Sequence, residues 1–129
     1  MGSSSSKSKK VKKTKNKIIE SKLSEDDIKK MKIRAEKRKK AVDELLQTEQ
    51  TYINRLTLCI DNFAKPLKNN NKLISFQNHE TLFKDLEVIR GLNSTFLNDL
   101  QSSVANWDNN NTMIGDYFIK FTPYFRMYQ

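Results

Sequence analysis

The chain is 129 residues long, which allows one domain at most. Its net charge of +9 arises in residues 1–40, which hold 16 basic and 5 acidic side chains, whereas residues 41–129 hold 8 basic and 10 acidic ones. A basic patch at one end does not make the whole chain a nucleic-acid-binding protein. The single cysteine excludes a disulfide framework within the chain, and no apolar run approaches the ~18 residues of a membrane span. We therefore expect a soluble, intracellular protein.

Residues 1–23 form a basic leader that contains almost nothing to bury. Repulsion between its lysines, together with its serine content, predicts disorder. We therefore divide the chain into a disordered leader, residues 1–23, and a folded helical region, residues 24–129.

The folded region begins with a long predicted helix. Ser24 and the acids after it are typical of a helix start, because the Ser side chain accepts from a free backbone N–H and acids favour the positive end of the helix dipole. Pro66 predicts an end at Lys65, since proline disfavours the helical conformation in the residue before it. Apolar residues at steps of three and four predict one buried face. This stripe consists of Val42, Leu45, Leu46, Tyr52, Ile53, Leu56, Ile60 and Phe63.

Two further apolar stripes follow, each after three asparagines that predict a turn, at residues 69–71 and 109–111. The second stripe covers residues 82–104, and Gly91 within it costs only about 1 kcal/mol relative to Ala. The third covers residues 114–121. No convincing alternating strand pattern appears, so we expect an all-α fold, an elongated and incomplete helical bundle behind a basic tail.

Glu49 lies on the apolar stripe of the first helix, three residues after Leu46 and three before Tyr52. The positions three and four residues away hold no Lys or Arg to pair with it. A carboxylate on a packing face without a partner costs free energy. Two interpretations stay open: the side chain reaches solvent or a distant basic group, or its partner lies on another protein.

The sequence offers little for catalysis or metal binding. Cys59 lies among apolar residues and is expected to pack as a small hydrophobe. His79 has only the adjacent Glu80 at ligand spacing, too few groups for a metal site. None of the three glycines lies in a GxxxxGK phosphate-binding loop. We therefore expect no metal, no cofactor, no catalytic residue and no nucleotide bound by the chain itself.

Three segments resemble the Dbl-homology (RhoGEF) domain, in the order in which that family has them. Residues 38–67 resemble its first block, E-L-x-x-T-E-x-x-Y-hydrophobic-x-x-L followed by a phenylalanine and Pro-Leu. Residues 81–100 and 114–128 are similar to the next two segments. The residues that match the first block are Glu44, Leu45, Thr48, Glu49, Tyr52, Ile53, Leu56, Phe63, Pro66 and Leu67.

The resemblance implies a guanine nucleotide exchange factor for Rho-family small GTPases, a regulator without covalent chemistry and hence not an enzyme. Glu49 matches the family's first-helix glutamate, which engages switch I of the GTPase, and Glu44, Thr48 and Tyr52 are implied as the neighbouring interface. The factor binds nucleotide-free GTPase more tightly, and by linkage this weakens the nucleotide and its Mg²⁺. The family's third block and long final helix do not follow in this sequence, which implies a truncated domain with reduced or no exchange.

The start of the leader fits the N-myristoylation pattern, with Gly2 as the acyl acceptor, and resembles the amino termini of Src-type kinases. One myristoyl chain holds a membrane only marginally, so stable anchoring needs a second signal. Lysines can supply it, each worth up to about 1 kcal/mol near anionic lipid. These are Lys7, Lys9, Lys10, Lys12, Lys13, Lys15 and Lys17. We expect a cytoplasmic protein at the inner face of the plasma membrane, with a plain solvated tail as the alternative.

Two other functions stay open. The first is a non-catalytic GTPase-binding or scaffold fragment that keeps the Glu49 surface but does not complete exchange. The second is a basic helical protein that binds nucleic acid through residues 7–40. That region lacks base-stacking aromatics, so only non-specific, salt-sensitive binding is expected.

Overall fold

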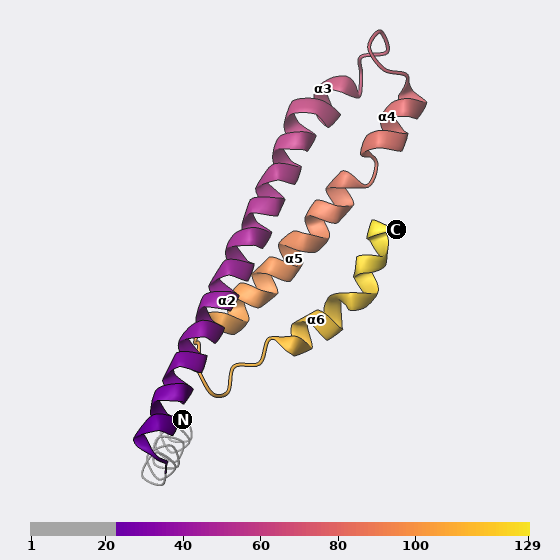
Figure 1. Cartoon of the computed structure of the whole chain (residues 1–129). Coiled ribbons are helices and arrows are strands. Elements are labelled where there is room, and N and C mark those ends of the chain that lie inside the picture. Colours follow the sequence, from indigo (N-terminus) through magenta and orange to yellow (C-terminus); the bar gives the residue numbers. More distant parts are fainter. Residues whose placement is uncertain (1–22) are drawn as a thin grey trace, which may run out of the picture. The chain divides into compact units, whose positions relative to one another are not determined.

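A computed structural model describes residues 23–129, and every regular element in that range is a helix (Figure 1). The chain divides into two units, residues 1–38 and residues 39–129. The predicted all-α class is confirmed. None of the helices in the described range is both long enough and apolar enough to cross a membrane. Gly2 and the seven lysines of the leader lie outside the described residues.

Helix α2 (Glu25–Cys59) begins in the first unit and ends in the second. Its start is the predicted one. The Ser24 hydroxyl accepts from the backbone N–H of Asp27 at 3.2 Å and donates to the Asp27 carboxylate at 2.7 Å. The three acids of the first turn face the positive end of the helix dipole.

A π-helix, η1 (Ile60–Ala64), follows α2 directly. Its wide turn is closed by the Lys65 N–H, which donates to the Ile60 carbonyl five residues earlier. After the fully buried Ile60, this wider turn brings Ala64 into the core at 8% exposure and leaves Phe63 at 58%. The predicted place of Phe63 on the buried stripe is therefore wrong, because the turn is wider than that of an α-helix.

The helical path then continues for one more turn, α3 (Lys65–Leu67). Lys65 keeps helical dihedral angles, φ −64° and ψ −49°, although Pro66 follows it. Proline is tolerated in the first turn of a helix because the N–H that it lacks has no intrahelical partner there. The predicted end at Lys65 is wrong by two residues for this reason.

The second predicted stripe forms two helices, α4 (Phe76–Phe83) and α5 (Leu86–Val104). The break between them changes the angular phase of the stripe, so Leu82 is 64% exposed instead of buried. Gly91 lies inside α5 as expected. Ser75 caps α4 by accepting from the backbone N–H of Asn78 at 3.3 Å.

The third stripe forms α6 (Gly115–Phe121), and a 3-10 helix, η2 (Thr122–Tyr128), completes the described chain. Proline lies in the first turn of η2, where it is again tolerated. Both asparagine runs lie in turns, as predicted.

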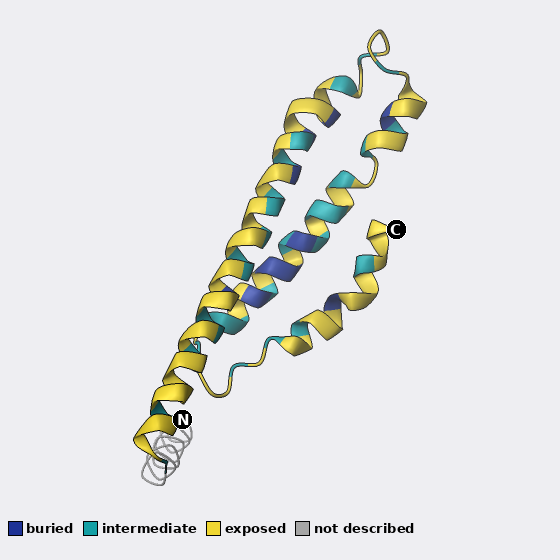
Figure 2. Ribbon diagram, viewed as in Figure 1, coloured by how far each residue is buried: buried dark blue, intermediate teal, exposed yellow. Residues whose placement is uncertain are grey.

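The core of the second unit forms where α2, α5 and α6 meet, and Figure 2 shows buried residues on the facing sides of α2 and α5. Phe96 of α5 is its centre, with edge-to-face contacts to Phe118, Phe121 and Phe125 at centroid distances of 5.1–6.0 Å. Such aromatic pairs add about 0.5–1.5 kcal/mol each beyond the area they bury. The buried centre is Phe96, Leu100 and Phe121, surrounded by Leu45, Leu46, Leu92, Ile114, Tyr117 and Phe125. This packing fixes η2 beside α5.

Candidate functional site

Glu49 lies in the part of α2 that belongs to the second unit, and its side chain is half-buried. Its Oε2 atom is shielded from solvent and has no hydrogen-bond partner among the described residues. Burial raises the pKa of this carboxyl above its ordinary value. Only one of the two carboxylate oxygens is shielded in this way, so both interpretations from the sequence stay open.

A chain of polar side chains lies next to Glu49 and joins three segments of the fold. The Asn93 amide donates to the Tyr128 hydroxyl and, at 2.8 Å, to the Ile89 carbonyl. Burial, a hydrogen bond with Tyr128 and the electrostatic effects of Tyr128 and Glu49 raise the pKa of Tyr52 to about 12. Tyr52 is therefore a neutral phenol at physiological pH.

Tyr52 lies next to Glu49 and is hydrogen-bonded to Tyr128, yet the Oε2 atom of Glu49 keeps no hydrogen-bond partner among the described residues. The site therefore presents an acceptor that a donor or cation from outside the described residues can satisfy.

Of the interface residues that the resemblance implies, the structure brings only Tyr52 next to Glu49. Glu44 and Thr48 are exposed. The Glu44 carboxylate lies 4.0 Å from the Lys40 ammonium, and the Thr48 hydroxyl donates to the Leu45 carbonyl at 2.9 Å. Both are open to a partner but lie outside the polar cluster of Glu49, Tyr52, Asn93 and Tyr128.

Sequence reasoning missed the roles of Asn93 and Tyr128. Asn93 is only 4% exposed, and it lies four residues after Ile89 and three before Phe96, on the apolar face of α5. A buried amide on such a face needs a partner, and this is the signal that indicates a polar contact there. Nothing local identifies the partner, since Tyr128 is 35 residues away. The described residues bring together no group of three or more His, Cys, Asp or Glu side chains placed to hold a metal ion.

Comparison with known proteins identifies the fold that carries this site. Residues 41–129 match the RhoGEF domain. The chain belongs to the RhoGEF family. All four residues of the polar cluster, Glu49, Tyr52, Asn93 and Tyr128, lie within the matched range.

Several curated proteins are similar to this RhoGEF chain. "Kinase and exchange factor for Rac B" of Dictyostelium discoideum is 36% identical over 98 residues, covering 72% of this chain and 9% of that protein. "Guanine exchange factor for Rac 30" of the same organism is 29% identical over 92 residues, with 71% and 6% covered. "Protein ECT2" of Mus musculus is 32% identical over 82 residues, with 60% and 9% covered. The chain thus spans less than a tenth of the length of each of these relatives. No solved structure gives a significant match.

Replacing Glu49 by Gln is expected to stabilise the protein at neutral pH. A raised carboxyl pKa means that the fold favours the protonated form, so ionised Glu49 lowers stability above its ordinary pKa of 4.5 and not below it. The gain at pH 7 is on the order of 1 kcal/mol or less, because solvent screens a half-buried group. Thermal unfolding of Glu49→Gln and the wild type at pH 7 and at pH 4 measures it, and the difference should shrink at the lower pH.

The matched control is Glu44→Gln, which removes an exposed carboxylate one and a half turns earlier on α2. It is expected to leave stability unchanged or slightly lower at both pH values. An equal response of the two variants would show that Glu49 carries no burial penalty.

Proposed function

We propose that this chain promotes guanine nucleotide exchange on a Rho-family small GTPase. Membership of the RhoGEF family supports this, and two of the relatives are named as exchange factors for Rac. The action is coupling without covalent chemistry: preferential binding of the nucleotide-free GTPase weakens nucleotide and Mg²⁺ by the same free energy. A tenfold weakening requires about 1.4 kcal/mol of differential binding.

The shielded Oε2 atom of Glu49, which has no hydrogen-bond partner among the described residues, is the observation that carries this proposal. A half-buried acceptor without a donor has already lost part of its hydration, so a partner that supplies a donor recovers free energy that the folded chain lacks. In our proposal this partner is switch I of the GTPase. Because Oε2 is already shielded from solvent in the free chain, binding does not have to remove water from this atom. This lowers the free-energy cost of forming the complex.

Two exposed residues, Glu44 and Thr48, and the half-buried Tyr52 provide the surroundings of Glu49 in the proposed contact. Glu44, Thr48 and Tyr52 follow one another at steps of four, so they lie along one side of α2. Tyr52 is hydrogen-bonded to Tyr128, whereas Glu44 and Thr48 are exposed and contact only residues of α2, which can give way to a partner. A rigid centre with an adaptable polar rim is the usual anatomy of an interface hot spot.

Glu49→Ala is expected to weaken capture of a nucleotide-free Rho-family GTPase by roughly tenfold or more, because truncating one partner of a desolvated charged contact costs over about 1.4 kcal/mol. Capture is measured by calorimetry on EDTA-treated GTPase, and exchange by release of fluorescent GDP. Glu36→Ala removes an exposed carboxylate from the same helix and is the control.

The proposal is contradicted if Glu49→Ala and Glu36→Ala change the affinity for the nucleotide-free GTPase equally. It is also contradicted if the wild type does not capture the GTPase. Capture that depends on Glu49 without accelerated GDP release selects the alternative, a GTPase-binding module that does not complete exchange.

We also propose that the leader attaches the protein to the inner face of the plasma membrane. Support comes from the sequence alone: Gly2 in a myristoylation pattern, followed by seven lysines within residues 7–17. One acyl chain and a polybasic segment together form the two signals that stable anchoring requires. If half of the lysines engage, affinity for anionic lipid rises by roughly a hundredfold.

Gly2→Ala is expected to move the protein from the membrane to the soluble fraction of a eukaryotic cell, because the polybasic segment alone binds weakly. Fractionation and metabolic labelling with a myristate analogue measure the two steps separately. Ser3→Ala, which keeps the acceptor glycine, is the control. A Gly2→Ala protein that stays at the membrane, or a wild type that takes up no label, removes the lipid from the proposal.

A further inference from the structure

A cavity of about 460 Å³ lies beside the turn that joins α3 to α4, within the second unit. Its volume falls in the range of sites that bind small molecules. Apolar side chains and three lysines line it together with a buried histidine. These residues are Ala64, Phe83, His79, Lys65, Lys68 and Lys84. The proposed contact with a GTPase uses none of them.

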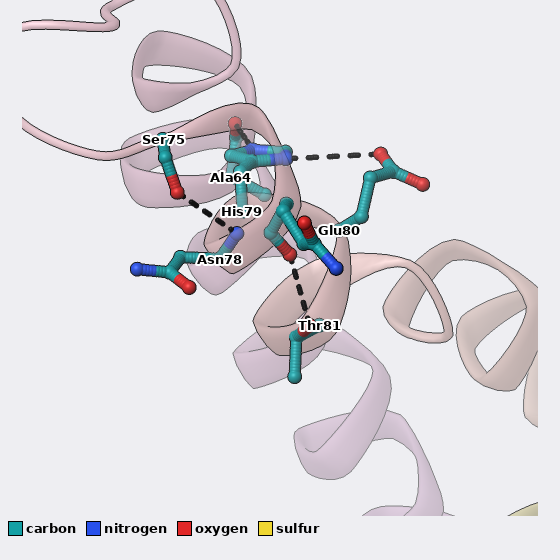
Figure 3. Close-up of polar contacts among 7 residues, drawn as sticks. Ala64, Ser75, Asn78, His79, Glu80 and Thr81 are labelled. Carbon is teal, nitrogen blue, oxygen red and sulfur yellow. Dashed lines mark hydrogen bonds and ion pairs between the residues drawn. The ribbon is translucent and has the colours of Figure 1, made fainter.

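His79 supplies an acceptor without a donor. Its side chain is 5% exposed, and its Nε2 atom lies 2.7 Å from the Ala64 carbonyl oxygen (Figure 3). A carbonyl only accepts, so Nε2 carries the hydrogen and, in the neutral ring, Nδ1 carries a lone pair. Nδ1 is buried without a hydrogen-bond partner among the described residues. The Glu80 Oε1 atom, 3.9 Å away, is also an acceptor and does not satisfy it.

The π-turn fixes this geometry. The Ala64 carbonyl accepts both from His79 Nε2 and from the Lys68 backbone N–H at 3.1 Å, and this joins α4 to the end of η1. One extra residue in a π-turn rotates the following side chains by about 100° around the helix axis. Here the rotated side chains include Lys65 and Lys68, which line the cavity. π-turns occur frequently at functional sites.

Two of the three lysines are available to a ligand. Lys65 is not one of them, because its ammonium group forms an ion pair with the Asp61 carboxylate at 2.6 Å. Asp61 does not line the cavity. Lys68 and Lys84 form no ion pair with any residue in the range 23–129. Lysine side chains that line one cavity can bind phosphate there through charge-assisted hydrogen bonds.

The cavity wall also carries the carboxylates of Glu80 and Glu87. They repel a ligand that is only a polyanion, but they accept hydrogen bonds from hydroxyl groups, as Nδ1 of His79 does. Nδ1 is shielded from solvent, so a hydroxyl reaches it only when neighbouring side chains shift, and the Glu80 side chain beside it is 44% exposed and has room to do so. Donors for phosphate and acceptors for hydroxyls thus line one cavity.

We propose that this cavity binds a phosphorylated polyol, the chemistry shared by sugar phosphates, inositol phosphates and inositol lipid head groups. Lys68 and Lys84 hold the phosphates, and His79, Glu80 and Glu87 accept from the hydroxyls. The apolar surface of Ala64 and Phe83 lies against the ring carbons. This mixed set distinguishes the cavity from the basic leader, which offers charge alone.

The test is calorimetric titration of the full chain with soluble inositol trisphosphate, in the wild type and in Lys68→Gln/Lys84→Gln. The double variant is expected to lose roughly tenfold or more in affinity. The control is Lys29→Gln/Lys72→Gln, which removes the same charge from exposed positions outside the cavity. It is expected to bind within about twofold of the wild type, since only screened, long-range attraction changes. Thermal unfolding checks that both variants remain folded.

Tripolyphosphate tests the contribution of the hydroxyls. It is a polyanion without hydroxyls, so it gains nothing from His79, Glu80 and Glu87, and Lys68→Gln/Lys84→Gln is expected to lower its affinity clearly less than that of inositol trisphosphate. Equal loss of inositol trisphosphate binding in the two double variants overturns the proposal. So does a tripolyphosphate affinity that falls with Lys68 and Lys84 as steeply as that of inositol trisphosphate.

Vesicles distinguish the two sources of the ligand. They are made of phosphatidylcholine with and without a phosphoinositide, and the same pair of double variants is used. Loss of phosphoinositide-dependent binding in Lys68→Gln/Lys84→Gln alone assigns the cavity to a lipid head group. Binding of the soluble head group without such vesicle binding assigns it to a free polyol phosphate.

Discussion

A carboxylate that the fold half buries and leaves without a donor is the constraint around which the second unit is organised. Glu49 lies on the packing face of α2, and its Oε2 atom is shielded from solvent and has no hydrogen-bond partner among the described residues. The phenol of Tyr52 beside it is hydrogen-bonded to Tyr128. Proteins keep such an arrangement at the expense of stability, and they do so mostly where a ligand or partner completes it.

The aromatic core determines where this polar cluster lies. Phe96 packs against rings of α6 and η2, and this places Tyr128 within reach of Asn93 on α5 and of Tyr52 on α2. The packing of Phe96, the hydrogen bonds of Tyr128 and the raised pKa of Tyr52 therefore depend on one another. A change in the Phe96 contacts acts on the site through Tyr128, although no atom of Phe96 belongs to the site. The cavity beside η1 depends on other interactions, namely the π-turn and the hydrogen bond between His79 and the Ala64 carbonyl.

Much of the fold follows from local sequence patterns. Ser24, the asparagine runs and the apolar steps of three and four identify the helices and their turns, because capping and periodicity are local effects. The π-turn and the break after Phe83 have no such signal. They reverse the expected burial of Phe63 and Leu82, since a stripe predicts burial only while the helical phase stays constant.

At the candidate site, too, the sequence predicts features that depend on nearby residues but not contacts between distant segments. The absence of a basic residue near Glu49 in α2 was visible from the sequence, and among residues 23–129 its Oε2 atom has no hydrogen-bond partner. The links to Asn93 and Tyr128 were not visible, because they arise from packing between segments far apart in the chain. The cavity around His79 was missed for a similar reason. Its lysines come from the end of one helical path and the start of the next.

The most direct measurement is the titration of the Glu49 carboxyl itself, followed by carbon NMR in the free protein and in its complex with a nucleotide-free Rho-family GTPase. We predict a midpoint above the ordinary value in the free protein, and a midpoint that falls well below it in the complex, where a donor stabilises the charge. An ordinary midpoint in the free protein, or a raised midpoint that the GTPase leaves unchanged, would contradict the account.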